Sequence, residues 1–305
     1  MITEHTPLFS TRYGHTAMMK WYARALERLD LEHESVTVPT RYGETHLVAT
    51  GPKDAPPVVL LHGMEGNAAS WRHQLADLHR DFRLYALDIL GSAGKSSPVR
   101  LSHDNHEYGA WLDDVLTGLG TERAHLVGIS NGSWIILKFA AYAPERVASA
   151  VLMSANGIMP VRFPYNMARF MNIRAVHATK DALALTLLTR GMVRRAVANT
   201  YVADADADPH EIEWFYLLAK YYHYRFPPGP VTDAEMASLK SPTLLLMGEQ
   251  EKFFPIPAVI ARARKHLPDL RAEIVSGVGH NMCTDNPQLI NNRLRQFISS
   301  LPRDQ

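Results

Sequence analysis

The amino-acid sequence predicts an α/β protein: a mostly parallel central sheet flanked by helices, with a helical segment inserted between two strands. The first observation is an alternation. Between residues 57 and 153, short apolar runs alternate with stretches long enough for amphipathic helices, and strand–helix–strand units of this kind place neighbouring strands parallel. The second observation is that the alternation stops near residue 156 and resumes near residue 242. We therefore expect one core, residues 1–155 and 240–305, and an inserted helical cap, residues 156–239.

Composition and charge exclude several classes of protein. Hydrophobic residues make up 46% of the 305 residues and charged residues 21%, which allows a sizeable core and excludes global disorder. Lysine and arginine number 32 against 31 aspartates and glutamates, so the formal charge of +1 offers no footprint for nucleic acid. Cys283 is the only cysteine, which excludes an internal disulfide and predicts a packing residue.

The sequence also carries expectations about location. Residues 1–7 lack the basic and then apolar segments of a signal peptide, and no apolar run reaches the ~20 residues of a membrane span. We therefore expect a cytoplasmic protein with no membrane span.

The chain begins with an amphipathic helix and a hairpin. Between residues 13 and 29, apolar residues recur at helical spacing, which predicts a helix packed on the domain surface in preference to a lid or a membrane-surface helix. Two short strands follow at residues 35–38 and 45–50, and the turn at residues 41–44 joins them as a hairpin.

A strand that is apolar on both faces comes next, at residues 58–61, as expected inside a parallel sheet. A helix at residues 67–78, another strand at residues 82–87 and a helix at residues 106–119 follow. The Gly/Ser loop at residues 91–96 resembles a phosphate-binding loop. Ile89 occupies the position of that motif's leading glycine, so no nucleotide site is expected.

The most informative stretch is the turn Gly128-Ile129-Ser130-Asn131-Gly132. A buried strand at residues 124–129 leads into it, and an apolar helix at residues 133–142 follows. Strand, sharp turn and helix is the setting in which Gly-x-Ser-x-Gly forms a nucleophile elbow. The two glycines let backbones pass close to the serine, where a Cβ would clash. Ser130 is therefore the candidate nucleophile, in preference to a capping serine at an ordinary turn.

The predicted cap follows a strand at residues 147–153. It contains aromatic clusters, such as residues 214–216 and 221–224. These clusters suggest a pocket for an apolar or aromatic substrate, although they are also typical of helix packing. Within the cap, Asp208 and Pro209 predict the start of a helix, with Asp208 as its N-cap.

The alternation of strands and helices then returns. Two further strands are predicted at residues 243–247 and 271–275, and two helices at residues 257–266 and 287–301. The first of these strands ends at Gly248-Glu249-Gln250-Glu251, and the second leads into Gly277-Val278-Gly279-His280.

A serine nucleophile needs a base, and position selects it among 15 histidines. Reacting groups of an open parallel sheet collect at the carboxyl ends of its strands, and His280 follows the last predicted strand. His62 also follows a strand, but it precedes a turn that the oxyanion donors need, so we interpret it as structural. The remaining histidines near predicted elements are interpreted as surface or packing residues: His103, His106 and His125.

The acid that orients the base should also follow a strand and lie between Ser130 and His280 in the chain. Glu251 is the preferred candidate, and Glu249, two residues nearer the strand, is its main rival. The strand that ends at residue 153 is followed by Asn156, which cannot supply a carboxylate.

An acyl-transfer site also needs N–H groups for the oxyanion. The backbone N–H of Asn131, directly after the nucleophile, is one expected donor. The second should come from the loop after the strand at residues 58–61, where Met64 follows His62-Gly63.

These motifs, in this order, resemble the α/β-hydrolase superfamily across residues 35–302. The acid of that superfamily is more often aspartate, and here Glu251 holds its position. The elbow Ile129-Ser130-Asn131-Gly132-Ser133-Trp134 and the Gly-Glu-x-Glu segment look like those of bacterial carboxylesterases. The resemblance implies an α/β-hydrolase fold and ester hydrolysis through an acyl-enzyme.

The expected function is therefore that of a serine carboxylesterase with Ser130, His280 and Glu251 as the catalytic triad. The expected partner is a small-molecule ester, and no cofactor or metal is expected. Two alternatives stay open. One is other chemistry on the same residues, such as carbon–carbon bond hydrolysis or cofactor-free peroxidation. The other is a small-molecule receptor that does not turn over.

Overall fold

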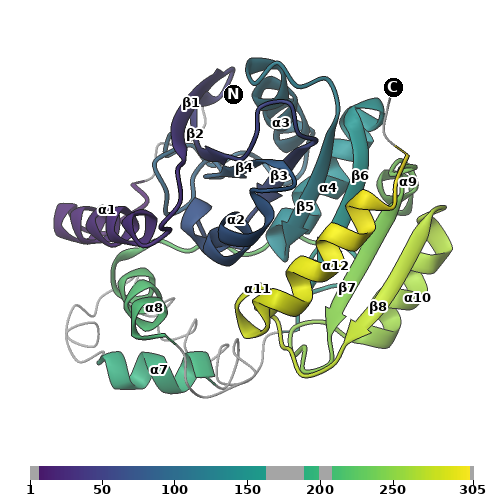
Figure 1. The fold of residues 1–305 in the computed structure, drawn as a ribbon. Coiled ribbons are helices and arrows are strands. Elements are labelled where there is room, and N and C mark those ends of the chain that lie inside the picture. The colour runs from purple at the N-terminus through teal and green to yellow at the C-terminus, as the bar shows by residue number, and fades with distance from the viewer. Residues whose placement is uncertain (1–6, 163–188, 199–207, 303–305) are drawn as a thin grey trace.

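The computed structural model describes residues 7–162, 189–198 and 208–302, and it contains one eight-stranded sheet (Figure 1). The strands lie in the order β1-β2-β4-β3-β5-β6-β7-β8. Their bounds are β1 (Glu34–Thr40), β2 (Gly43–Thr50), β3 (Pro57–Leu61), β4 (Arg83–Leu87), β5 (Ala124–Ile129), β6 (Val147–Met153), β7 (Thr243–Gly248) and β8 (Leu270–Val275). Strands β1 and β2 pair antiparallel, as do β2 and β4, and every other pair is parallel. The prediction of a mostly parallel sheet is confirmed.

Helices cover both faces of the sheet. Figure 1 shows α2 and α12 on the near face and α3, α4 and α10 on the far face. The described helices are α1 (Arg12–Glu27), α2 (Arg72–Leu78), α3 (Glu107–Gly118), α4 (Asn131–Tyr142), α7 (Arg190–Ala198), α8 (Pro209–Tyr221), α9 (Asp233–Ala237), α10 (Ile256–His266), α11 (Met282–Asp285) and α12 (Pro287–Ser299), with 3₁₀ turns η1 (Ala68–Trp71) and η2 (Pro144–Arg146).

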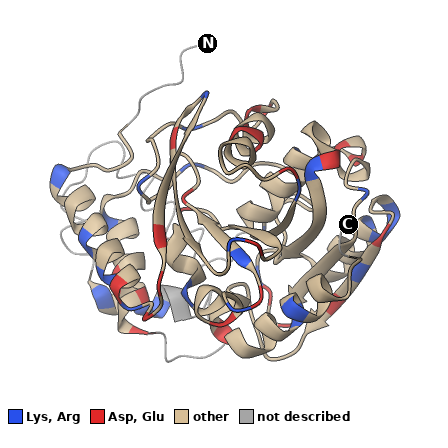
Figure 2. Ribbon diagram, turned by 45° about the horizontal axis from the view of Figure 1, so that its top comes forward, with Lys and Arg blue, Asp and Glu red and all other residues tan. Residues whose placement is uncertain are grey.

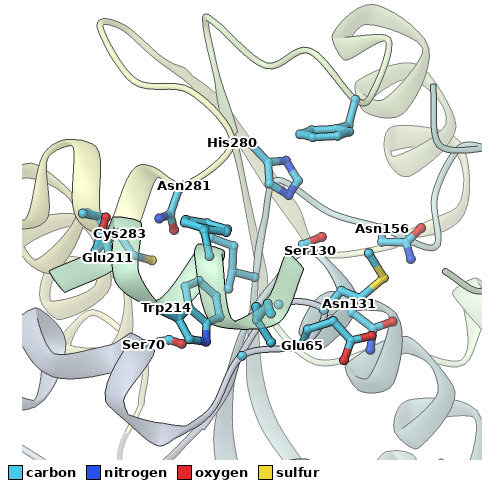
Figure 3. A pocket seen from close by; sticks show the side chains of 18 of the residues that line it. Glu65, Ser70, Ser130, Asn131, Asn156, Glu211, Trp214, His280, Asn281 and Cys283 are labelled. Atoms are coloured by element: carbon cyan, nitrogen blue, oxygen red, sulfur yellow. The ribbon is translucent and has the colours of Figure 1, made fainter. Parts of the chain in front are cut away.

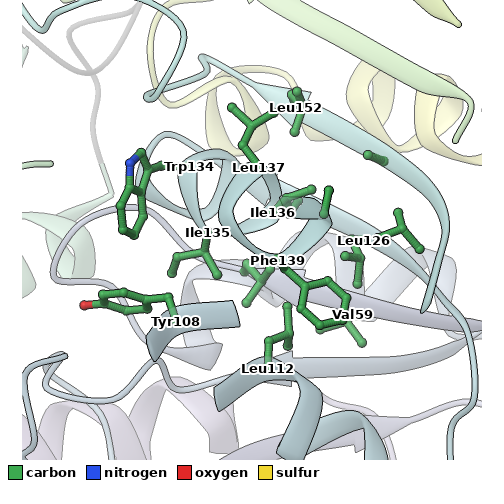
Figure 4. Packing of buried hydrophobic residues seen from close by; sticks show 14 of the residues in the cluster. Val59, Tyr108, Leu112, Leu126, Trp134, Ile135, Ile136, Leu137, Phe139 and Leu152 are labelled. Atoms are coloured by element: carbon green, nitrogen blue, oxygen red, sulfur yellow. The ribbon is translucent and has the colours of Figure 1, made fainter. Parts of the chain in front are cut away.

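The central strands are mostly apolar, as expected for strands with both faces buried. In β5, Leu126 packs into the cluster beneath α3 and α4, whereas the next residue, Val127, packs into the cluster on the opposite face. Figure 4 shows the first of these layers, with Phe139 of α4 and Leu112 of α3 over the sheet. Two-sided burial holds the strand ends, and the loops that follow them, in fixed positions.

The boundaries predicted for the core agree with the structure to within a few residues, and the differences concern short helical turns. No element was predicted at residues 144–146, where η2 lies. The predicted helix at residues 67–78 is divided into η1 and α2, because Asn67 caps a short 3₁₀ turn before the α-helix starts at Arg72. A short helix, α11, occupies residues that had no predicted element.

The N-terminal helix α1 packs on the domain, as expected, and buries Trp21 and Tyr22. The indole N–H of Trp21 donates to the carbonyl of His210 in α8, at 2.8 Å. Helix α1 thus joins the core to the inserted segment.

Three parts of the inserted segment are described: residues 156–162, 189–198 and 208–239. None of these parts adds a strand to the central sheet. Helix α8 begins as predicted, since the Asp208 side chain accepts from the His210 N–H and Pro209 is the first helical residue. Helices α7 and α8 pack on each other, whereas α9 packs against α4 and α10 of the core.

Figure 2 shows basic and acidic segments interspersed around the molecule, in keeping with the formal charge of +1. Among the described helices, none is long and apolar enough to cross a lipid bilayer.

The N-terminus of α4 lies against the end of β3 with almost no space between the two backbones. A Cβ built on Gly132 would lie 2.0 Å from the carbonyl oxygen of Leu61, and one on Gly128 would lie 2.5 Å from the carbonyl carbon of Gly132. Real Cβ contacts are never this short, so both positions require glycine. The elbow motif is therefore a packing requirement of the sheet as well as a chemical signature.

We expect Gly132→Ala to destabilise the fold by about 3 kcal/mol, the upper end of the usual cost of overpacking, because rigid backbone surrounds the site. Urea denaturation measures the free energy of unfolding. Gly229→Ala is the matched control, because a Cβ there meets nothing within 4 Å, and it should change stability by less than about 0.5 kcal/mol. Equal stability of the two variants would contradict this account of the elbow.

Candidate active site

Ser130 occupies the tip of the turn between β5 and α4 in a strained backbone conformation. Its φ is 52° and its ψ −112°, a region that costs a non-glycine residue about 1–3 kcal/mol. The N–H of Ser130 donates to the carbonyl of Met153 at 2.8 Å, which ties the turn to the end of β6. Helix α4 starts at Asn131, so its positive end faces the serine.

His280 and Glu251 meet as a buried pair, although 29 positions separate them in the chain. Nδ1 of His280 lies 2.8 Å from Oε2 of Glu251. The Glu251 side chain has no exposed surface, and its other oxygen accepts the N–H of Phe253 at 2.8 Å. The ring of Phe253 packs edge-on against the imidazole, with centroids 4.6 Å apart. These contacts fix both the carboxylate and the plane of the imidazole.

Opposing effects set the pKa of Glu251. Burial by itself would raise the pKa of this carboxyl, but the charge and hydrogen bond of His280 and the N–H of Phe253 hold it below its usual range. Glu251 is therefore ionised at neutral pH and suited to orient and stabilise a protonated imidazole.

Glu249, the rival acid, lies elsewhere. Its carboxylate accepts from the Ser276 hydroxyl at 2.7 Å and from the Gly277 N–H at 3.1 Å, on the exposed surface. The hydrogen bond from Ser276 holds the pKa of Glu249 below its usual range. Its contacts serve the loop after β8 rather than the His280 imidazole.

The loop after β3 runs beside Ser130. A Cβ built on Gly63 would lie 3.6 Å from that of Ser130, and both Met64 and Asn131 line the same pocket as the serine. The N–H of Asn131, at the start of α4, belongs to the first turn of a helix, where backbone N–H groups lack intrahelical acceptors.

His62 anchors this loop. Its Nε2 accepts the N–H of Ile89 at 3.1 Å, so its Nδ1 carries the proton and donates to the Gly63 carbonyl at 2.7 Å. Complete burial lowers the pKa of His62, which keeps the ring neutral. The geometry agrees with the structural role expected for this residue.

Asp88 supports the same loops from below. Its buried carboxylate accepts from the Tyr22 hydroxyl, the His46 ring and the backbone N–H groups of Ala68 and Lys95, at 2.7–2.9 Å. Burial by itself would raise the pKa of Asp88, but these hydrogen bonds hold it below its usual range. The carboxylate is thus fully engaged as a scaffold.

The other histidines considered in the sequence have packing or surface contacts. His103 packs edge-on against Trp134, and burial lowers its pKa to about 4. His125 bonds the Ser149 hydroxyl at 2.8 Å, and His106 lies near Tyr142 at the surface. Cys283 is buried, as expected, and its burial raises the pKa of the thiol, but it also lines the pocket.

Ser130, Asn131 and His280 open onto one pocket, and Figure 3 shows the imidazole directed toward Ser130. The cavity holds about 150 Å³, roughly ten times the space that a single water needs. Its outer wall comes from the inserted segment, through Val193 of α7 and Trp214, Phe215 and Leu218 of α8.

The sequence analysis missed three charged residues of this pocket, Glu65, Arg72 and Glu211. The pattern at residues 208–211 predicted a helix start but carried no signal that Glu211 faces the site. Among the described residues, no group of three or more His, Cys, Asp or Glu side chains is placed to hold a metal ion.

A mostly parallel sheet with a serine at a strand–helix turn, and with a histidine and a carboxylate beyond later strands, defines the architecture of an α/β hydrolase. A family model for the alpha/beta hydrolase fold matches residues 56–287. The chain belongs to this family.

Two named relatives match nearly the whole chain. The chain is 33% identical to the carboxylesterase YbfK of Bacillus subtilis, over 91% of this chain and 92% of the relative. It is 31% identical to the uncharacterized carboxylesterase nap of the same organism, over 92% of this chain and 91% of the relative. A crystal structure of carboxylesterase CesB (YbfK) superposes with a TM-score of 0.81 and 28% identity, covering 95% of this chain and 100% of that one. The expected resemblance to bacterial carboxylesterases is confirmed.

We expect His62→Ala to lower the free energy of unfolding by about 3 kcal/mol, because it leaves the buried Ile89 N–H without its acceptor and removes the imidazole that bonds the Gly63 carbonyl. Urea denaturation again provides the measurement. His79→Ala is the control. Among the described residues, the imidazole of His79 hydrogen-bonds only the Leu75 carbonyl, so this change should cost less than about 1 kcal/mol. A His62 variant as stable as the control would show that the ring does not anchor the loop.

Proposed function

We propose that this protein is a serine carboxylesterase that cleaves esters through an acyl-enzyme, with Ser130, His280 and Glu251 as its catalytic triad. The observation that carries the proposal is the buried His280–Glu251 pair, 2.8 Å between nitrogen and oxygen, in the pocket that Ser130 enters. The strained elbow at Ser130 supports it, as do the carboxylesterase names of two relatives.

In the proposed mechanism, Ser130 Oγ attacks the ester carbonyl while His280 accepts the serine proton. Nδ1 of His280 faces Glu251, so the proton transfer runs through Nε2. Glu251 stabilises the imidazolium, which then protonates the departing alkoxide. Water enters, His280 takes a proton from it, and hydrolysis of the acyl-enzyme releases the acid and restores Ser130.

We assign the oxyanion to the backbone N–H groups of Met64 and Asn131. Each such donor contributes about 3 kcal/mol to transition-state stabilisation in comparable sites. The proximity of Gly63 to Ser130 and the position of Asn131 at a helix start support the assignment. His62 and Asp88 hold the loop in place, so little reorganisation is needed as charge develops.

Residues 156–239 serve as the cap in this proposal, and the described helices α7 and α8 supply its pocket wall. Val193, Trp214, Phe215 and Leu218 present apolar surface to the cavity. This lining supports an apolar or aromatic substrate over a strongly charged one, since transfer of apolar groups from water into such a wall is favourable.

Ester hydrolysis is preferred to the alternatives because a specific observation supports it. Two relatives that match more than 90% of the chain are named carboxylesterases. A receptor without turnover would not need an ionised, buried carboxylate against His280. Repeated turnover of a short p-nitrophenyl ester tests the proposal directly, and release of no more than one product per protein would refute it.

We expect Ser130→Ala to abolish ester hydrolysis and labelling by a fluorophosphonate, because the change removes the nucleophilic oxygen. The fold should persist, since Ser130 lies at the turn tip and only one atom is lost; circular dichroism checks this. Labelling that persists at another serine would refute the assignment.

We expect Glu251→Gln to lower kcat at least about a hundredfold with KM nearly unchanged, because the charge that stabilises the protonated His280 is lost. Glu249→Gln is the matched control and should stay within a few-fold of the parent, since its carboxylate bonds Ser276 and Gly277. Steady-state kinetics on one ester measures both. An exchange of the two behaviours would make Glu249 the acid.

A further inference from the structure

A buried carboxylate oxygen in the pocket has no use in the proposed triad mechanism. Glu211 lies in the first turn of α8 and is 5% exposed. One of its oxygens accepts from Arg72 at 2.7 Å. The other, Oε2, has no hydrogen-bond partner among the residues that the structure describes. Leaving a buried acceptor unpaired costs about 1–3 kcal/mol, so the oxygen calls for a donor that the described chain does not supply.

The pairing with Arg72 decides what kind of donor this is. Arg72 begins α2 in the core, and its ion pair with Glu211 is mostly buried, with side chains 21% and 7% exposed. The two charges cancel, so a positively charged ligand group would gain little from Glu211 while facing Arg72. A neutral donor, such as a hydroxyl or an amide N–H, satisfies the remaining oxygen without adding charge.

An unpaired donor stands beside this acceptor. Trp214 follows Glu211 by three residues on α8, so the two side chains share one helix face. Its indole Nε1 is buried and, within the described part of the chain, has no acceptor. The indole stacks on Trp21, with ring centroids 6.0 Å apart, which restrains its orientation. Glu211 thus offers an acceptor to a ligand group and Trp214 a donor, from two positions on the same helix.

These groups lie away from the reacting atoms. Figure 3 shows Glu211 well separated from Ser130, with Trp214 between them in that view. The lining also includes apolar side chains, among them Val193, Phe215 and Leu218. The pocket therefore combines a reactive serine, apolar lining and a charged pair remote from the serine.

We propose that Arg72, Glu211 and Trp214 form a polar subsite that selects esters with a hydroxyl or amide group remote from the ester carbonyl. The inference deepens the proposed esterase function and rests on it. Glu211 and Trp214 are specificity-determining residues in this account, and neither touches the reacting atoms. The substrate class is an ester with an apolar chain that ends in a neutral hydrogen-bonding group.

The test compares isosteric esters that differ only at the far end. Two series of esters are assayed, both with chains of four to ten carbons. In the first, p-nitrophenyl esters of ω-hydroxy acids are compared with esters of the same shape that end in a methyl group. In the second, acetates of ω-hydroxy alcohols are compared with acetates that end in a methyl group. At the length that reaches the subsite, kcat/KM should favour the hydroxyl ester by about tenfold or more, the range of one well-placed hydrogen bond to a charged group.

Variants then test which residues cause the preference for hydroxyl esters. Glu211→Gln should reduce the ratio of hydroxyl to methyl kcat/KM about tenfold, because a neutral amide replaces the charged acceptor. Trp214→Phe should reduce it several-fold, and this variant carries the test if Glu211→Gln does not fold. Glu213→Gln is the matched control: Glu213 lies on the same helix, pairs with Arg24 at the surface and does not line the pocket, so the ratio should not change.

Each other outcome overturns a defined part of the argument. Equal or lower kcat/KM for the hydroxyl esters at every length, in both series, overturns the subsite alone, and an ordered water would then satisfy Glu211. A preference that survives in both the Glu211 and Trp214 variants places the selecting group elsewhere and also overturns it. Failure to hydrolyse any of the esters overturns the proposed function, and the subsite with it.

Discussion

The close approach of two backbones beside Ser130 is the constraint on which the rest of the site depends. Gly132 lies against the carbonyl of Leu61 at a distance that excludes any Cβ, and Ser130, two residues earlier, has a positive φ of 52°. This packing joins the end of β3 to the start of α4. The nucleophile, the helix N–H group next to it and the loop after β3 therefore move as one body, which is the preorganisation that acyl transfer requires.

The buried carboxylates of the site need hydrogen bonds or charges that replace the water they lose. Glu251 is ionised despite complete burial because His280 and the Phe253 N–H compensate the lost water. Four hydrogen-bond donors compensate the buried Asp88 carboxylate in the same way, and this residue supports the neighbouring loops. Glu211 differs, since one of its oxygens has no partner within the described chain. Hydrogen bonds within the protein thus satisfy two of these carboxylates, and the third is the one that we propose to bind a substrate group.

Most of the core could be predicted because its signals are local or periodic. Apolar runs indicated the parallel strands, and the positions of Ser130 and His280 followed from the rule that loops at the carboxyl ends of parallel strands meet. The choice between Glu249 and Glu251 could not be made with the same certainty. Both follow β7, and only the loop geometry directs one carboxylate toward His280 and the other toward Ser276.

By itself, the sequence determined the α/β class, the elbow and the order of the candidate triad residues, because strand periodicity and glycine spacing are properties of short segments. Only the tertiary structure decided which acid faces the histidine and that Arg72 meets Glu211 across 139 positions. Contacts of that kind depend on how α2 and α8 pack in space. No spacing along the chain encodes them, since many pairings of buried charges are compatible with the same pattern.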